Sequence, residues 1–224
     1  MEYKLEIDSV NKSFGGKKVL SDIYLKCEIG EIVGIFGRNG SGKSTLLKIL
    51  FGTLKAENSF IRLNNKVLTQ SFKMENGISY LPQNNFIPNN FSVIKTVNLT
   101  IEENRVDEFW EDNIIQKLKN SSVGELSVGE LKYLQIKLIL FNKSKFCLLD
   151  EPYSGISPAI ATEINKQIKE QSKNKGLIIT DHSYSHLLEI TTKIYLINKG
   201  CGRYLENETE LVKFGYLNEG MLKK

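Results

Sequence analysis

A nine-residue stretch with the sequence GRNGSGKST, at residues 37–45, constrains the fold of this chain more than any other feature. It follows a short apolar, β-branched run from Glu31 to Phe36 and leads into the helix-like segment TLLKILFG, which ends at Gly52. Glycines in such a loop let backbone N–H groups approach phosphate oxygens, and the following helix adds the positive end of its dipole. A strand, a glycine-rich loop and a helix in this order predict a phosphate-binding P-loop.

The P-loop supplies candidate ligands for a nucleotide. We expect Lys43 to contact the β- and γ-phosphates and Ser44 to offer its hydroxyl to Mg²⁺. A glycine-rich turn with a chance lysine is the alternative interpretation, and the strand and helix on either side argue against it. The other nucleotide-binding positions predicted in this loop are Gly37, Asn39, Gly40, Gly42 and Thr45.

An acidic pair lies further along the chain, where the apolar run FCLL at residues 146–149 ends in Asp150 and Glu151. Parallel sheets bind ligands at the carboxyl ends of their strands, so we expect Asp150 to hold Mg²⁺ through water. We expect Glu151 to point at the γ-phosphate and to act as general base on the attacking water. A buried strand with an acidic end is the structural alternative, which the upstream P-loop disfavours.

Two other classes of P-loop enzyme fit less well. A GTPase would be expected to carry an Asn-Lys-x-Asp motif that recognises guanine. The two Asn-Lys pairs in this chain, at residues 11–14 and 142–145, both lack the aspartate. A small-molecule kinase usually has a lid and no acidic pair of this kind. The choice of family therefore rests on the sequence between the P-loop and the acidic strand.

Composition restricts the setting in which such an enzyme works. The net charge of +4 is spread along the 224 residues, which gives no indication of a nucleic-acid partner. Cys27, Cys147 and Cys201 lie far apart without Cys-x-x-Cys spacing, which favours a reducing cytosol over disulfides or zinc. The N-terminus does not resemble a signal peptide, and no apolar run reaches the roughly 18 residues that cross a bilayer. We expect no membrane span, so that a membrane process would need another chain.

The pattern along the chain predicts an α/β fold. Alternation at Tyr3, Leu5 and Ile7, and a β-like run from Val19 to Cys27, predict an antiparallel β edge. From residue 145 strands and helices alternate, which predicts parallel βαβ units. The strands expected there cover residues 146–150, 177–180 and 193–197, the helices 158–171 and 184–190, and earlier strands 60–63 and 78–81.

We interpret the whole chain, residues 1–224, as a single domain. Residues 1–84 and 142–224 would form a RecA-like parallel core with the antiparallel edge, and residues 85–141 an inserted helical subdomain. Helical spacing in VDEFWEDNIIQKLK and in ELKYLQIKLILF supports that insertion.

Four further motifs identify a family. Leu126 to Glu130, LSVGE, resembles the signature motif of ABC ATPases, and Leu81-Pro82-Gln83 resembles their glutamine loop. Thr180-Asp181-His182 resembles the switch histidine, and Phe14 matches the aromatic residue that stacks on adenine. The motifs occur in the family's order across nearly the whole chain. The stretches YLPQNNFIPNNFSV and DEPYSGISP, with GYL near the end, most resemble the lipopolysaccharide-export and branched-chain amino-acid branches of the family. The resemblance implies a P-loop NTPase fold.

The resemblance also implies an ATPase mechanism with ATP and Mg²⁺ as cofactors. Gln83 would lie at the Mg²⁺ and the attacking water, and His182 would join Glu151, Gln83 and Lys43 in catalysis. Ser127 and Gly129 of the signature would reach the γ-phosphate bound to a second ATPase subunit, expected to be an identical copy arranged head to tail. An integral membrane permease would be the other partner, which would hold the chain on the inner face of the cell membrane.

Two positions depart from the family's pattern. Val128 replaces the first glycine of the signature, where a β-branched residue takes positive φ at a cost and hinders close approach. Ser157 stands where an aspartate is expected in the loop after the acidic pair, and is itself a good helix cap. These departures motivate a non-hydrolysing nucleotide-dependent clamp as one alternative function, and a soluble ABC ATPase of the iron–sulfur assembly type is another.

Several single residues have alternative interpretations. Phe14 could be a core aromatic residue and Gln83 an ordinary loop amide. Phe86, Ile87 and Phe91 could line a groove for a helix of the membrane subunit or pack inward. His182 and His186 lack the glutamate and the third ligand of a zinc protease site.

Overall fold

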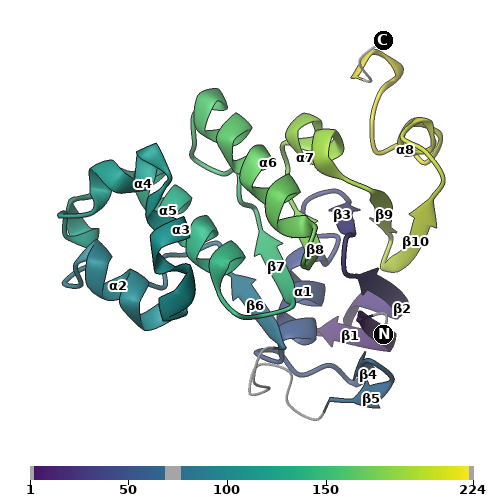
Figure 1. Cartoon of the computed structure of the whole chain (residues 1–224). Helices are drawn as coiled ribbons and strands as arrows, with labels where there is room; N and C mark the ends of the chain where they lie inside the picture. The colour runs from purple at the N-terminus through teal and green to yellow at the C-terminus, as the bar shows by residue number, and fades with distance from the viewer. Residues whose placement is uncertain (1–2, 69–76, 222–224) are drawn as a thin grey trace.

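The computed structural model describes residues 3–68 and 77–221, which form two sheets and surrounding helices (Figure 1). The larger sheet has six strands in the order β10-β9-β3-β8-β7-β6. Its strands are β3 (Ile32–Phe36), β6 (Ile78–Leu81), β7 (Phe146–Asp150), β8 (Gly176–Thr180), β9 (Lys193–Asn198) and β10 (Cys201–Leu205).

Parallel pairing brings the functional ends of this sheet together. Strands β6, β7, β8, β3 and β9 are mutually parallel, and only β10 pairs antiparallel. Thr180 is in register with both Ile35 and Asp150, and Leu81 with Leu149. The P-loop, Gln83, Glu151 and His182, each of which follows one of these strands, therefore leave the same edge of the sheet.

The smaller sheet is antiparallel and forms the predicted edge. Its order is β2-β1-β4-β5, with β1 (Lys4–Phe14), β2 (Lys17–Glu28), β4 (Asn58–Leu63) and β5 (Lys66–Val67). Alternate residues Leu5 and Ile7 are fully buried, as expected for strands with one face on a core. The two strands that the opening sequence predicts are thus longer than expected but lie in the right place.

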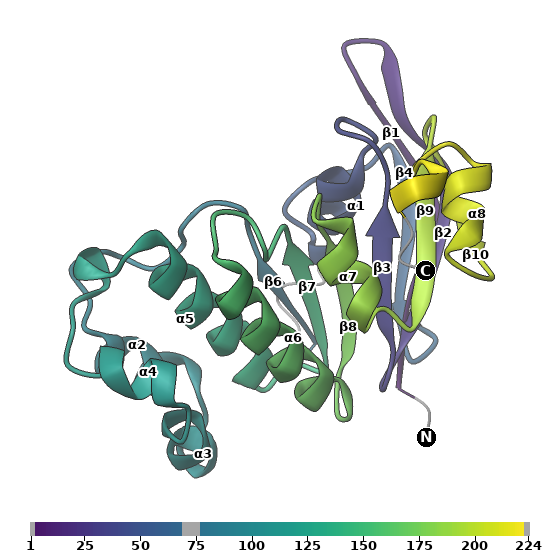
Figure 2. The same cartoon turned by 90° about the horizontal axis from the view of Figure 1, so that it is seen from above.

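Helices cover both faces of the larger sheet. Helix α1 (Lys43–Phe51) packs through Leu46, Leu47, Ile49 and Leu50 into a core cluster with residues of both sheets. Helices α6 (Pro158–Ser172) and α7 (Tyr184–Ile190) cover the opposite face (Figure 2). The layers place the helix that follows the P-loop between the two sheets, where its first turn is held from both sides.

Residues 92–141 form a helical region that projects to one side of the sheet (Figure 1). It contains α2 (Val93–Thr100), α3 (Val106–Trp110), α4 (Asn113–Leu118) and α5 (Val128–Phe141), with short 3-10 turns at Glu103–Arg105 and Val123–Glu125. The segment VDEFWEDNIIQKLK is not one continuous helix, because the Asp112 carboxylate accepts N–H bonds from Ile114 and Ile115 and begins α4. The helical character of this region agrees with the predicted helical spacing, which the structure divides between α3 and α4.

Some elements were not predicted. Strand β10, helix α8 (Thr209–Lys213), strand β5 and the final turn Glu219–Met221 carry no strong periodic pattern. Cys201 is the first residue of β10. Within the described residues, none of the helices combines the length and apolar character needed to cross a membrane.

Candidate nucleotide-binding site

A pocket of about 360 Å³ opens at the carboxyl edge of the larger sheet. It brings together residues from the P-loop, β1, β2, and the loops after β6, β7 and β8. They are Phe14, Val19, Asn39, Gly40, Ser41, Gly42, Lys43, Ser44, Thr45, Gln83, Glu151 and His182. Nearly all of the residues that the sequence predicts around a nucleotide within one chain thus line one pocket, while their roles stay predictions.

The P-loop adopts a conformation that requires glycine. Gly40 has φ 74° and Gly42 φ 103°, and a Cβ on Gly42 would lie 2.7 Å from a Leu20 methyl group. The Lys43 ammonium donates to the carbonyls of Gly37 at 2.7 Å and Arg38 at 3.4 Å. Burial lowers the pKa of Lys43, and the nearby carboxylates of Glu151 and Asp150 oppose that shift. A cation held over the loop in this way suits a phosphate ligand.

Asp150 is fully buried and accepts three hydroxyl hydrogen bonds. Ser44 and Thr180 donate to its Oδ1, each at 2.8 Å, and Tyr80 donates to its Oδ2 at 3.0 Å. The Gln83 Nε2 donates to the Ser44 hydroxyl at 3.2 Å. A carboxylate and a hydroxyl, both hard oxygen ligands, meet here beside the Gln83 side chain, and Mg²⁺ prefers such ligands with water and phosphate oxygens in its other positions. The residues present therefore fit Mg²⁺.

Glu151 stands at the centre of the polar groups on the other side of the pocket. Its Oε1 accepts from Gln83 Nε2 at 2.8 Å and lies 2.9 Å from His182 Nε2. The Glu151 side chain is 21 % exposed, so water reaches it. Its backbone has φ 54°, an uncommon conformation for a residue with a side chain. The acidic strand end, the glutamine loop and the histidine loop thus meet at one carboxylate.

Phe14 lies at the rim of the pocket and not in the core. Its ring is 48 % exposed, and the Lys12 ammonium stands 5.0 Å from the ring centroid. The core-aromatic interpretation of Phe14 was therefore wrong. An exposed ring beside a phosphate-binding loop is available for stacking on a base.

The signature residues lie outside this pocket. Ser127 caps α5: its hydroxyl accepts from the Glu130 N–H and donates to the Glu130 carboxylate at 2.6 Å, which lowers the pKa of Glu130. Neither Ser127 nor Gly129 is among the described residues that line the pocket. Val128 is the first residue of α5, is 71 % exposed and does not have positive φ. The backbone strain expected at Val128 was wrong, because a helical residue occupies the right-handed region.

The structure also shows the environments of other residues discussed from the sequence. Ser157 caps α6 by accepting the Ile160 N–H, as predicted. Ile87 is buried at 5 % exposure while Phe86 is 43 % exposed, so the two point to different environments. Cys147 is fully buried, as expected for a small apolar residue.

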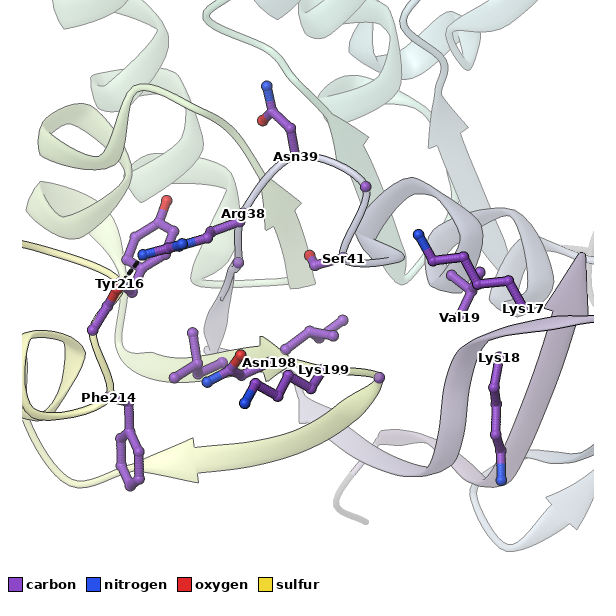
Figure 3. A pocket seen from close by; sticks show the side chains of 16 residues that line it. Lys17, Lys18, Val19, Arg38, Asn39, Ser41, Asn198, Lys199, Phe214 and Tyr216 are labelled. Atoms are coloured by element: carbon purple, nitrogen blue, oxygen red, sulfur yellow. Dashed lines mark hydrogen bonds between the residues drawn. The ribbon is translucent and has the colours of Figure 1, made fainter.

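A second cavity, of about 700 Å³, borders the outer flank of the P-loop (Figure 3). The Arg38 guanidinium donates to the carbonyl of Gly215 at 3.1 Å, and the Tyr216 hydroxyl has a backbone hydrogen bond with Gly37. The Tyr216 ring also meets Phe36 edge-on at 5.9 Å. The C-terminal segment thus supports the first residues of the P-loop.

Besides Val19 and Ser41, which line the pocket, three residues that support the site were not predicted. Tyr80 and Thr180 fix the Asp150 carboxylate from neighbouring strands. The Asp181 carboxylate accepts the backbone N–H groups of Tyr153 at 2.8 Å and Ser183 at 2.7 Å. Tyr80 directly precedes the glutamine loop, and Thr180 and Asp181 directly precede His182. Their adjacency to these motifs was the signal in the sequence that could have identified them.

Comparison with known proteins identifies the family. The model of the ABC transporter family matches residues 20–154, more than half of the chain. The chain belongs to the ABC transporter family. The predicted P-loop NTPase fold is confirmed, because solved ATP-binding cassettes of ABC transporters superpose on nearly the whole chain.

Named ABC relatives are similar over most of their length. The lipopolysaccharide export system ATP-binding protein LptB is 29 % identical in Haemophilus influenzae, covering 96 % of this chain and 97 % of the relative. LptB of Escherichia coli is 30 % identical over 88 % of this chain and 87 % of its own. A probable ABC transporter ATP-binding protein of Azorhizobium caulinodans is 32 % identical over 84 % of this chain and 72 % of its own.

Solved ABC structures agree with this fold. An ATP-binding subunit of an ABC transporter superposes with a TM-score of 0.82 at 18 % identity, covering 94 % of this chain and 93 % of the other. An ATP-binding cassette in its ADP conformation superposes with a TM-score of 0.77 at 25 % identity, covering 95 % and 94 %.

Proposed function

We propose that this ABC subunit hydrolyses ATP with Mg²⁺, as one of two ATPase subunits that drive a membrane permease. The observation that carries the proposal is the position of Glu151, whose carboxylate bonds to Gln83 and adjoins His182 at the mouth of the P-loop pocket. A carboxylate beside a phosphate-binding loop is placed for general-base catalysis on water.

Each residue has a role that its position supports. Lys43 would exchange its loop carbonyls for the β- and γ-phosphates, and the N–H groups of the P-loop would hold the remaining phosphate oxygens. Ser44 and Asp150, with Gln83, would hold Mg²⁺, which when bound neutralises charge on the phosphates. Glu151 would accept a proton from the attacking water, and Gln83 and His182 would orient that carboxylate and the water.

The exposed signature supports a head-to-tail pair of identical subunits. Ser127 and Gly129 stand at the N-terminus of α5 and outside the pocket of their own chain. A helix N-terminus attracts an anion, and a second copy would bring it to the γ-phosphate. Nucleotide would then stabilise the closed pair, and hydrolysis would reopen it. The names of the relatives, which include an export system, support a permease as the other partner, at the inner face of the membrane.

The decisive experiment compares phosphate release by the purified chain and by Glu151→Gln, while light scattering follows oligomeric state with ATP and Mg²⁺. We expect turnover in the parent, a loss of at least about 100-fold in Glu151→Gln, and an ATP-dependent dimer in that variant. Glu170→Gln, an exposed acid on α6, is the matched control and keeps parental turnover. ATP binding without turnover in the parent would overturn the proposal.

A further inference from the structure

The pair formed by Glu151 and His182 joins two loops that the chain makes separately. Glu151 follows β7 and His182 follows β8, and these strands lie side by side in the sheet (Figure 1). Both side chains are partly exposed, at 21 % and 46 %, so packing alone does not fix their 2.9 Å contact. The pairing of β7 with β8 sets the spacing of the two loops where they leave the sheet, and contacts beyond that point can hold the loops further along.

Asp181 makes such contacts. It is 3 % exposed and does not line the nucleotide pocket. Its Oδ2 accepts the backbone N–H of Tyr153, two residues after Glu151, and its Oδ1 accepts the backbone N–H of Ser183, directly after His182. One rigid carboxylate therefore spans both loops and holds each beside its functional residue.

The cost of this arrangement indicates a specific use. Burial raises the pKa of Asp181, and the N–H bonds from Ser183 and Tyr153 oppose the shift. Burying a carboxylate costs desolvation free energy, which an apolar residue at this position would avoid. The loop it holds is also strained, since Glu151 has φ 54° while its N–H bonds to the Thr180 carbonyl at 2.8 Å.

We propose that Asp181 is a positioning residue for hydrolysis, which sets the Glu151–His182 geometry by bridging their two loops through backbone hydrogen bonds. The inference rests on the proposed ATPase function. It predicts that Asp181 affects the hydrolytic step more than ATP binding, because both of its carboxylate oxygens accept backbone N–H groups and it is not among the described residues that line the pocket.

The test substitutes Asp181→Asn, which keeps the size of the side chain but directs an amide N–H₂ group at one of the two backbone donors. We expect kcat to fall by about 10-fold or more while KM and the Kd for ATP stay within about 2-fold. The Kd is measured on the full chain by equilibrium binding of labelled ATP, and kcat by release of radiolabelled phosphate, which detects slow turnover.

Lys175→Met is the matched control for simple loss of stability. Lys175 lies just before the opposite end of β8, is 4 % exposed and donates to two backbone carbonyls, those of Asn142 and Ser144. It mirrors Asp181 in burial and in bridging two backbone groups, yet it lies at the far edge of the sheet. We expect its melting temperature to fall while kcat at 20–25 °C stays within about 2-fold of the parent.

A double-mutant cycle with His182→Ala completes the test. If Asp181 acts through the Glu151–His182 pair, Asp181→Asn lowers kcat by less than about 3-fold in the His182→Ala background. An equal loss in both backgrounds, or a loss of ATP affinity with kcat retained, overturns the positioning role. Parental turnover with a fully active Asp181→Asn overturns this inference alone, whereas no turnover in the parent overturns the proposed function and this inference with it.

Discussion

Val128, which stands where the family's signature motif has a glycine, affects the proposed dimer interface more than it affects the fold. It stands at the first position of α5, where its backbone is helical, and its side chain is 71 % exposed beside Ser127. A Cβ built on Gly155, in the loop after the acidic pair, would lie 3.4 Å from a Val128 methyl group. The valine therefore adds apolar bulk to the surface that we propose faces the nucleotide of a second copy.

Val128→Gly should raise ATP turnover, because it removes that bulk without relieving any backbone strain. We expect an increase of about 3- to 10-fold in kcat/KM and a tighter ATP-dependent dimer of Glu151→Gln. Val67→Gly, on the exposed strand β5, is the matched control and should leave turnover unchanged. Equal turnover in Val128→Gly and the parent would show that the valine is neutral at this interface.

Residues that act through their own motif could be predicted, and residues that act through a neighbouring strand could not. Lys43, Ser44 and Glu151 follow from local sequence, because the loop or strand end that carries them also determines their environment. Tyr80 and Thr180 reach Asp150 only because the strand order places β6 and β8 on either side of β7. That order is a property of the whole sheet.

At the scale of elements, buried strands and long helices were predictable and capped short helices were not. Strands β3, β7 and β8 are buried along their whole length and appear in the sequence as apolar runs. The region of α3 and α4 has helical spacing throughout, but Asp112 interrupts it by capping. In the sequence Asp112 lies among polar residues, which does not indicate that it is buried. Its buried partners are identified only in the folded structure.

Those partners join the helical region to α5. The Lys137 ammonium donates to Asp112 Oδ2 at 2.8 Å, with side chains 3 % and 5 % exposed, and Tyr133 donates to the same oxygen. Burial raises the pKa of Asp112, but the hydrogen bonds from Lys137 and Tyr133 outweigh that effect and hold the pKa below its ordinary value. Since the folded pKa is the lower one, the ionised pair stabilises the fold at neutral pH, and that stabilisation is lost as the pH falls through the folded pKa.

Asp112→Asn should therefore lower the free energy of unfolding by about 3–5 kcal/mol at pH 7, because it leaves Lys137 charged and buried. The difference from the parent should narrow as the pH falls below about 4. Urea unfolding followed by the fluorescence of Trp110, the single tryptophan, measures this in α3 itself. Asp112→Asn combined with Lys137→Met should regain part of the loss; a difference that does not vary with pH would contradict the role of the ion pair.

At the scale of the whole molecule, one chain carries both parts of the proposed composite ATP site, but the two parts lie apart from each other. The P-loop pocket opens at the sheet edge, and the signature stands at the start of α5 outside it. The sequence indicates both halves by their motifs, and it indicates the need for a second copy only through family resemblance. In the structure, Ser127 and Gly129 are not among the described residues that line the pocket, which supports the proposal of a second copy.

Mixing two inactive variants should restore activity if the pair is head to tail. In a homodimer of Lys43→Ala, both P-loops lack the phosphate-binding lysine. In a homodimer of Ser127→Arg, both signature motifs are blocked by the arginine side chain. A mixed dimer keeps one intact site of two, so random mixing should give about a quarter of the parental rate. Replacing either partner by a chain with both substitutions leaves no intact site and is the negative control. No recovery in the mixture would argue against head-to-tail pairing.

The φ of 54° at Glu151 implies a trade-off between catalytic activity and thermal stability. Glycine adopts this backbone without strain, so Glu151→Gly should unfold at a higher temperature than the parent even though it abolishes turnover. A screen that selected this protein only for heat resistance would thus discard its proposed general base. The strained carboxylate persists, on this view, because cells select for work done on ATP and tolerate a less durable protein as a result.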